Sequence, residues 1–231
     1  MAFFVQAWAR MMTRAITILA ILTGAAPVAT AAAATNAASM ATAAEMDKRC
    51  NSAEKASRSK PDLVFADVSD QVMAPKGQGE WREFRDSADL KSATEEGAPN
   101  TQALLWRFPD GVLFVQMFFH SHSGDWAHYA DHCFRADGSL ARVTETLNTF
   151  NAGLLDEEFE SGNDGGVSRV RIKYFSSDGT LLKKKSRLLD LKTRKPVKRS
   201  FMDQDDVAYR RISDVPFFDL LKKQTTGTGT P

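Results

Sequence analysis

The sequence lacks the short motifs that identify common enzyme classes. It contains no Gly-x-Ser-x-Gly elbow, no glycine-rich phosphate loop, no His-Glu-x-x-His and no Cys-x-x-Cys. Its 30 basic and 29 acidic side chains nearly cancel, so net charge selects no class of partner. An active site assembled from distant residues would leave no motif in the sequence. The absence of every common motif nevertheless favours a protein that is not an enzyme. We therefore assign no catalytic residue, no cofactor and no metal ligand.

Acidic side chains are also missing from the first 34 residues. Two early arginines precede an apolar stretch from Ala15 to Leu22 and an alanine-rich tail, which is the order of a secretory signal. Ala29 and Ala31 occupy the positions that a signal peptidase reads. We therefore predict a signal peptide over residues 1–31, cleaved after Ala31.

An uncleaved membrane anchor is the main alternative, because Ala15 to Ala34 has the length of a spanning helix. This stretch is rich in alanine and threonine and contains Gly24 and Pro27, so it is weakly apolar for a stable span. Met11 or Met12 would be an alternative start with a shorter signal. The prediction is a periplasmic or secreted protein.

Only two cysteines occur, Cys50 and Cys133, and both belong to the mature part. An exported protein meets an oxidising compartment, so we predict that the two form a disulfide. The bond would close a loop of about 83 residues, for which loop entropy gives at most about 4.5 kcal/mol. The alternative is a pair of buried free thiols.

Composition divides the mature chain into three predicted parts. Residues 32–44 form a flexible lead-in, residues 45–223 a single β-rich domain, and residues 224–231 a disordered tail. Alanines and charges from Ala43 to about Ser57 have helical spacing and predict a helix that carries Cys50.

An Asp-Gly pair occurs three times, at residues 110–111, 137–138 and 178–179, each after an aromatic residue and before a β-prone stretch. Glycine supplies the positive φ that a three-residue hairpin loop needs. Ser123-Gly124 adds a fourth turn, and this regular spacing predicts an antiparallel meander. A short strand or turn is expected near residues 63–68, and longer strands over residues 103–108, 112–121, 126–135, 139–150, 166–176, 180–191, 197–203 and 206–212.

The strand predicted at 112–121 has apolar side chains on both faces, as Phe114 and Phe118 alternate with Val115 and Met117. Such a strand lies centrally with both sides covered. The predicted fold class is mainly β: a curved antiparallel meander of about 7–8 strands, half-barrel or barrel-like. One N-terminal helix and one short C-terminal helix, capped by Asp214, complete it.

All four histidines, His120, His122, His128 and His132, lie on one predicted hairpin. Imidazole is the commonest transition-metal ligand, so the cluster suggests a metal site or a hydrolase. A three-residue loop at 123–125 places all four on one side, whereas a two-residue loop separates the first two from the last two. We favour the alternative of solvated or hydrogen-bonded histidines near a hairpin tip.

Residues 166–201 contain 12 basic side chains and two acidic ones. A three-residue turn at Asp178-Gly179 would align six of these cations on one face: Arg169, Arg171, Lys173, Lys183, Lys185 and Arg187. This basic face of 169–199 could contact an anionic membrane surface or a partner. A solvated outer face is the alternative. Export removes the protein from nucleic acid, which is not expected as a partner.

Together these features favour an exported, non-enzymatic binding module whose concave sheet holds an apolar ligand or docks an envelope protein. A cavity lined by Phe114, Phe118 and Trp126 would favour the apolar ligand. The plan resembles periplasmic half-barrel carriers of lipoproteins and small β-barrel ligand binders at the level of fold alone. The alternatives are a histidine- or metal-dependent hydrolase built on the 120–132 hairpin, and anionic-surface or partner binding through the basic face of 169–199.

Overall fold

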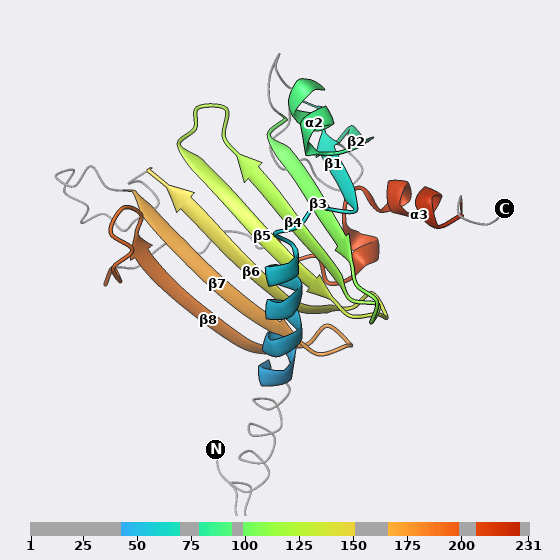
Figure 1. The fold of residues 1–231 in the computed structure, drawn as a ribbon. Coiled ribbons are helices and arrows are strands. Elements are labelled where there is room, and N and C mark those ends of the chain that lie inside the picture. The colour runs from blue at the N-terminus through green and yellow to red at the C-terminus, as the bar shows by residue number, and fades with distance from the viewer. Residues whose placement is uncertain (1–42, 70–78, 94–98, 151–165, 199–206, 227–231) are drawn as a thin grey trace, which may run out of the picture.

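The structure is a computed structural model that describes residues 43–69, 79–93, 99–150, 166–198 and 207–226. The predicted signal peptide, nearly all of the lead-in and the last five residues of the predicted tail lie outside the described residues. Eight antiparallel strands form one open sheet in the order β2-β1-β3-β4-β5-β6-β7-β8 (Figure 1). The predicted antiparallel meander with an N-terminal and a short C-terminal helix is confirmed, and the sheet does not close into a barrel.

Consecutive hairpins build most of this sheet. Six strands coincide with predicted ones: β3 (Thr101–Arg107), β4 (Leu113–His120), β5 (Trp126–Phe134), β6 (Leu140–Thr149), β7 (Val167–Phe175) and β8 (Leu181–Asp190). β1 (Leu63–Asp67) confirms the short strand expected there and pairs with β3. β2 (Trp81–Phe84) and helix α2 (Ser87–Ala93) were not expected, because both are short and polar.

The predicted strand at 206–212 is wrong over its described part. Side chains bind the backbone groups that a strand ladder would use: Val207 N donates to Glu145 Oε1 at 3.1 Å, and Val207 O bonds His132 Nε2 at 2.7 Å. Over the described residues 207–212, the ladder is reduced to a single β-bridge between Ser139 and Arg211. Most of the strand predicted at 197–203 lies outside the described residues.

The C-terminal helix differs from its prediction at its start. A 3-10 turn, η2 (Ile212–Asp214), precedes α3 (Phe218–Thr226), so Asp214 belongs to the turn and does not cap the helix. Phe217 and Leu221 are buried against the sheet, as expected for an apolar helix face. None of the described helices combines the length and apolar character needed to cross a bilayer.

The three Asp-Gly turns form as predicted. Gly111, Gly138 and Gly179 have φ of 80°, 78° and 87°, a conformation that costs a residue with a Cβ atom extra energy. In each turn the aspartate side chain accepts the N–H two residues further on, as Asp137 does from Ser139 at 2.9 Å. The turns therefore share one hydrogen-bonding pattern.

A bulge follows two of these turns. In β5–β6, Phe134 pairs with Leu140 but Cys133 pairs with Arg142, so Ala141 is the additional residue. In β7–β8, Phe175 pairs with Leu181 but Tyr174 pairs with Lys183, which leaves Leu182 as the additional residue. An added residue exchanges the faces of all side chains beyond it. The β3–β4 hairpin has no such shift.

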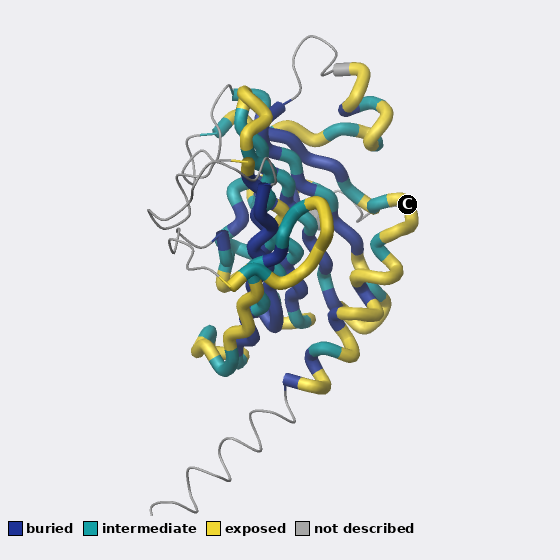
Figure 2. Tube along the Cα trace, turned by 90° about the vertical axis from the view of Figure 1, so that its left-hand side faces the viewer, coloured by how far each residue is buried: buried dark blue, intermediate teal, exposed yellow. Residues whose placement is uncertain are grey.

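The sheet has two different faces. The C-terminal face carries the larger core, where Phe65, Met117 and Phe134 pack under the segment that contains Phe217. The Phe65 and Phe217 rings stack with centroids 4.7 Å apart. The other face, here called the helix face, carries the N-terminal helix across one end. Figure 2 shows the buried positions concentrated in the strands between these coverings.

Candidate functional site

The N-terminal helix, whose described part covers residues 43–56, lies across one end of the helix face (Figure 1). It buries Ala43, Met46, Cys50 and Ala53, which are spaced three or four residues apart and therefore form one apolar side. These residues pack in a cluster with Trp106, Phe114 and Tyr174 of the strands. The predicted helix carrying Cys50 is confirmed.

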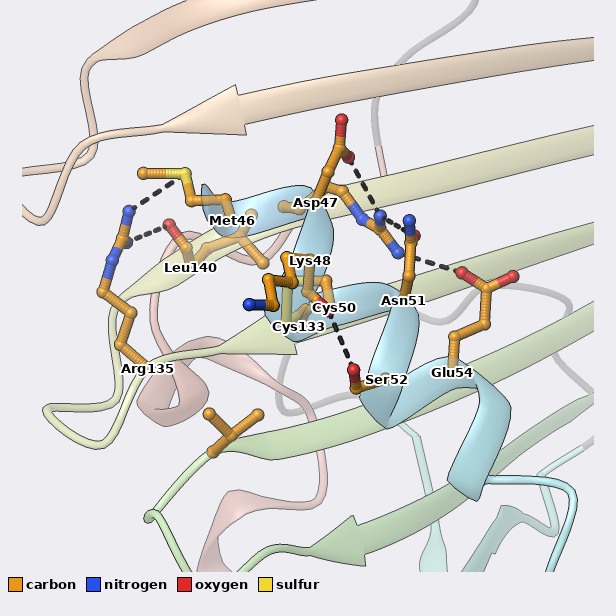
Figure 3. The surroundings of a disulfide bond; sticks show 12 residues. Met46, Asp47, Lys48, Cys50, Asn51, Ser52, Glu54, Cys133, Arg135 and Leu140 are labelled. Carbon is orange, nitrogen blue, oxygen red and sulfur yellow. Dashed lines mark hydrogen bonds and ion pairs between the residues drawn. A yellow bond between two sulfur atoms is a disulfide. The ribbon is translucent and has the colours of Figure 1, made fainter. Parts of the chain in front are cut away.

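The predicted disulfide between Cys50 and Cys133 joins this helix to β5 (Figure 3). Both cysteines are buried, and their Cα atoms lie 5.8 Å apart. The bond therefore fixes the helix on the face of the sheet that the Cys133 side chain occupies.

Arg142 on β6 adds a polar attachment for the same helix. Its guanidinium binds Asp47 Oδ1 at 3.1 Å and Glu54 Oε2 at 2.9 Å, and it also donates to Asn51 Oδ1. Figure 3 labels these three helix residues. The Arg142 side chain is only 4% exposed, whereas Glu54 is half exposed. Asp47, Asn51 and Glu54 occupy successive turns of one helix side, so a single buried arginine fixes the helix along its length.

Tyr174 continues this network toward the sheet edge. Its hydroxyl donates to the Asp47 carboxylate at 2.8 Å and accepts from Lys185 Nζ at 3.1 Å. Burial raises the pKa of Asp47, but the hydrogen bonds from Tyr174 and Arg142 outweigh it, so the Asp47 pKa is lowered. The helix is thus a rigid wall at one end of the helix face.

Beyond the helix the same face stays open. We call this region the open half-face and define it by nine partly exposed residues of β3 to β6: Gln102, Gln116, Phe118, His120, Tyr129, Asp131, Thr144, Thr146 and Asn148. It contains no lysine or arginine, and Asp131 is its only carboxylate. The surface is therefore composed chiefly of amides, hydroxyls and aromatic rings.

An aromatic group forms the centre of the open half-face. The Phe118 ring lies 4.9 Å from the Tyr129 ring and 5.3 Å from the His120 ring, measured between centroids. Tyr129 is 36% exposed, so its large ring faces solvent while it packs against Phe118. Thr146 lies directly opposite Tyr129 on the neighbouring strand.

A polar cavity lies where the open half-face meets the end of the helix. Its volume is about 570 Å³, and it is lined by Asn51, Glu54, Lys55, Ser57, Arg58, Gln116 and Asp131. Gln116 Nε2 donates to Asp131 Oδ1 at 3.0 Å. Burial raises the pKa of Asp131 to about 6, with a further increase from Glu54. A titratable group perturbed in this way beside a cavity is a common property of functional sites.

Sequence reasoning missed Asp131 and Gln116 as site residues. The signal was present, since Asp131, Tyr129 and Cys133 alternate on one strand and must share a face. A disulfide from a helix to Cys133 therefore places that helix beside Asp131 and Tyr129.

The histidines do not converge. The β4–β5 hairpin has a four-residue loop, closed by Ser121 N donating to Trp126 O, and pairs His120 with Ala127. This even-numbered loop has the parity of the two-residue alternative, so His120 lies on the helix face while His128 and His132 lie on the C-terminal face. Within the described residues, no group of three or more His, Cys, Asp or Glu side chains could hold a metal ion.

His128 and His132 are buried in the core of the C-terminal face. His132 Nε2 lies 2.7 Å from Val207 O and its Nδ1 lies 3.1 Å from Ala130 O; a neutral imidazole has a single N–H and donates to one of these two carbonyls. Burial lowers the pKa of His128 to about 4 and also lowers the pKa of His132, although nearby Glu145 opposes both changes. Both rings are therefore neutral structural groups at neutral pH.

The predicted basic face is wrong in its composition. Because Leu182 forms a bulge, Arg171 pairs with Ser186, and the cations of β7 lie on the opposite face from Lys183, Lys185 and Arg187. The β7 cations are buried, and Glu145 binds Arg171 and Lys173 at 3.3 and 3.2 Å. Among the described residues of 166–198, exposed positive charge is confined to β8 and the turn after it.

The three aromatic residues expected to line a ligand cavity are also separated. Phe114 is fully buried beneath the N-terminal helix, and Phe118 belongs to the open half-face. Trp126 packs on the core of the C-terminal face. Comparison with protein families, curated proteins and solved structures found no match.

Proposed function

We propose that this protein is an exported, non-enzymatic binding module that holds its ligand against the open half-face. The carrying observation is that the exposed Tyr129–Phe118 pair lies one cross-strand row from the polar cavity of Gln116 and Asp131. Aromatic surface with a few convergent polar groups is the usual composition of a ligand site. The signal peptide predicted over residues 1–31 and the Cys50–Cys133 disulfide support a periplasmic or secreted location.

Rigid support favours binding at this position. The helix wall is fixed by the disulfide and by Arg142, and the sheet supplies the floor. A site that is ordered before its ligand arrives loses less conformational entropy on binding. Polar side chains on a regular sheet are therefore presented in a defined arrangement.

The size of the open half-face favours a small ligand over a partner protein. Four strands at about 4.8 Å and three rows at about 6.8 Å give an area of about 400 Å². A stable protein interface buries about 800 Å² on each partner. The ligand we propose is polar as well, since amides and hydroxyls outnumber apolar side chains here.

Capture from an envelope extract tests this proposal. The exported protein is immobilised, exposed to the extract, and its eluate is separated into lipid, glycan and protein. Tyr129→Ser should lose the captured ligand, whereas Leu181→Ser, which alters a 47% exposed side chain at the start of β8, should keep it. The proposal would be contradicted if both variants recovered equal amounts of ligand. It would also be contradicted if neither the variants nor the unaltered protein recovered any ligand.

A second candidate function uses β8 and its following turn. Residues 183–198 carry eight cations with Asp190 as the single acidic residue, and seven of these cations are exposed. A strand and turn with this excess of exposed cations would attract the headgroups of an anionic membrane. Sedimentation with phosphatidylglycerol vesicles should be abolished by raised salt and by Lys185→Glu with Arg187→Glu, and binding to phosphatidylcholine alone would contradict this function.

A further inference from the structure

We propose that the ligand of the open half-face is an uncharged oligosaccharide. The inference rests on the binding function proposed above and names its ligand class. It follows from three features of the described residues: an aromatic platform, hydrogen-bonding groups of both kinds around it, and the distribution of charge.

Tyr129 provides the platform. A sugar ring presents C–H groups on its faces, and these pack on the face of an exposed aromatic ring whose π system is electron-rich. The Tyr129 ring is exposed to solvent and packs against the Phe118 ring, which in turn contacts His120. A ring already held by packed neighbours loses little rotamer entropy when a sugar covers it.

Groups that both donate and accept hydrogen bonds surround this ring. Thr146 lies directly opposite Tyr129, at a cross-strand separation of about 5 Å, and Asn148 is its diagonal neighbour at about 7–8 Å. Gln102 lies in the same row beyond Phe118. Hydroxyls and amides match sugar hydroxyls, each of which donates one hydrogen bond and accepts others.

The cavity extends this pattern toward the helix. Gln116 uses its Nε2 atom on Asp131 Oδ1, and Asn51 uses its Oδ1 atom on Arg142. These bonds fix both amide orientations, so Gln116 Oε1 and Asp131 Oδ2 are the remaining acceptors and Asn51 Nδ2 is the remaining donor. A second sugar unit, linked to the one on Tyr129, would find both kinds of partner here.

Charge distinguishes this ligand class from others. No lysine or arginine lies among the nine residues of the open half-face; Lys185 and Arg187 share its side of the sheet but lie on β8, two strands beyond β6. In the cavity the carboxylates of Glu54 and Asp131 offset the two cations that line it and oppose an anionic chain. Lys55 and Arg58 line the cavity and oppose a cationic ligand. A lipid chain would desolvate the amides and hydroxyls without replacing their hydrogen bonds, which is costly. An uncharged polyhydroxylated chain meets none of these penalties.

The experiment titrates the exported protein with uncharged hexasaccharides of glucose, in both α-1,4 and β-1,4 linkage, and of N-acetylglucosamine. Isothermal titration calorimetry measures the affinity. At least one hexasaccharide should bind. Tyr129→Ala should weaken that binding at least about tenfold, and Tyr129→Trp should preserve it, because the platform remains. Leu181→Ala is the control for an exposed apolar residue elsewhere and should bind as the unaltered protein does.

Two outcomes would overturn the inference. One is that no uncharged hexasaccharide binds; if envelope capture still depends on Tyr129, the ligand class is wrong and the binding function stands. The other is that an anionic oligosaccharide, such as a uronic acid hexamer, binds more tightly and loses affinity with Lys185→Glu instead of Tyr129→Ala. Failure of both the capture and the titration would contradict the binding function itself.

Discussion

Arg142 Nη1 lies 3.1 Å from Asp47 Oδ1, and this contact joins the N-terminal helix to β6 across 95 positions of the sequence. It exists because Ala141 is a bulge residue, which directs the Arg142 side chain to the helix face. The same face carries Cys133, Asp131 and Tyr129. The contacts that hold the N-terminal helix and the residues of the site beside it therefore lie on the same face of the sheet.

Replacing Arg142 should destabilise the protein strongly. Arg142→Ala leaves Asp47 and Glu54 without their buried partner, and we expect a loss of about 2–4 kcal/mol in the free energy of unfolding, moderated because both carboxylates are partly exposed. Arg142→Lys should lose most of this as well, because a compact ammonium lacks the planar fork whose two ends reach Asp47 and Glu54 on different helix turns. Urea denaturation measures both. Arg187→Ala on exposed β8 is the control, and a comparable loss there would contradict the assigned role.

Removing the disulfide should also loosen the helix wall. The closed loop spans 83 positions, which gives an upper limit of about 4.5 kcal/mol, and we expect a loss of about 2–4 kcal/mol in the Cys50→Ala, Cys133→Ala double variant. Denaturation with and without reductant checks the value. Reductant should reduce the stability of the unaltered protein and leave the double variant unchanged. An equal effect on both would show that the bond is not the source of the difference.

Asp131 should make stability fall as pH rises through about 6. Its pKa is raised from 3.8 to about 6 by burial, so the folded state keeps a proton that the unfolded chain has lost. The contribution is complete below pH 3.8 and is lost above about 6. Asp131→Asn stays uncharged and retains the Oδ1 acceptor, so it should stabilise the protein by about 1–2 kcal/mol at pH 8, after allowance for partial exposure. No stabilisation is expected at pH 3.5, and a pH-independent effect would contradict this.

The buried histidines should give the opposite slope. The pKa of His128 is lowered from 6.5 to about 4, so its contribution is present above pH 6.5 and is lost as pH falls through about 4. Between pH 7 and pH 4 the difference is about 3 kcal/mol. His128→Gln, made in the Asp131→Asn background to remove the opposing slope, should reduce the dependence of unfolding free energy on pH over this range, with the contribution of His132 remaining. An unchanged slope would show that His128 is not the titrating group.

Much of the fold could be predicted from local chemistry. The Asp-Gly turns fix their own geometry through glycine φ and the aspartate side chain, so β3 to β8 follow from the sequence. The Cys50–Cys133 pair could be predicted because the sequence pattern of the first 31 residues indicated export. The apolar residues of β1 also indicated a short strand, whereas β2 is too short and polar to leave a pattern and depends on pairing with β1.

The faces of the strands could not be predicted, because they depend on single inserted residues. Leu182 and Ala141 carry no sequence signal that distinguishes a bulge from a regular strand position, yet each exchanges every side chain that follows. The predicted basic face therefore failed although its turn was correct. Whether the histidines converge depended in the same way on the length of one loop, and the even-numbered loop between His120 and His128 separates them, as in the second register considered from the sequence.

The most direct measurement is an NMR map of the protein while the ligand captured from the envelope extract is added. The account predicts that shifts concentrate on Phe118, Tyr129, Thr146 and the cavity residues Gln116 and Asp131, with β8 and α3 unaffected. Shifts confined to β8, or to the C-terminal face around His128, would contradict the account.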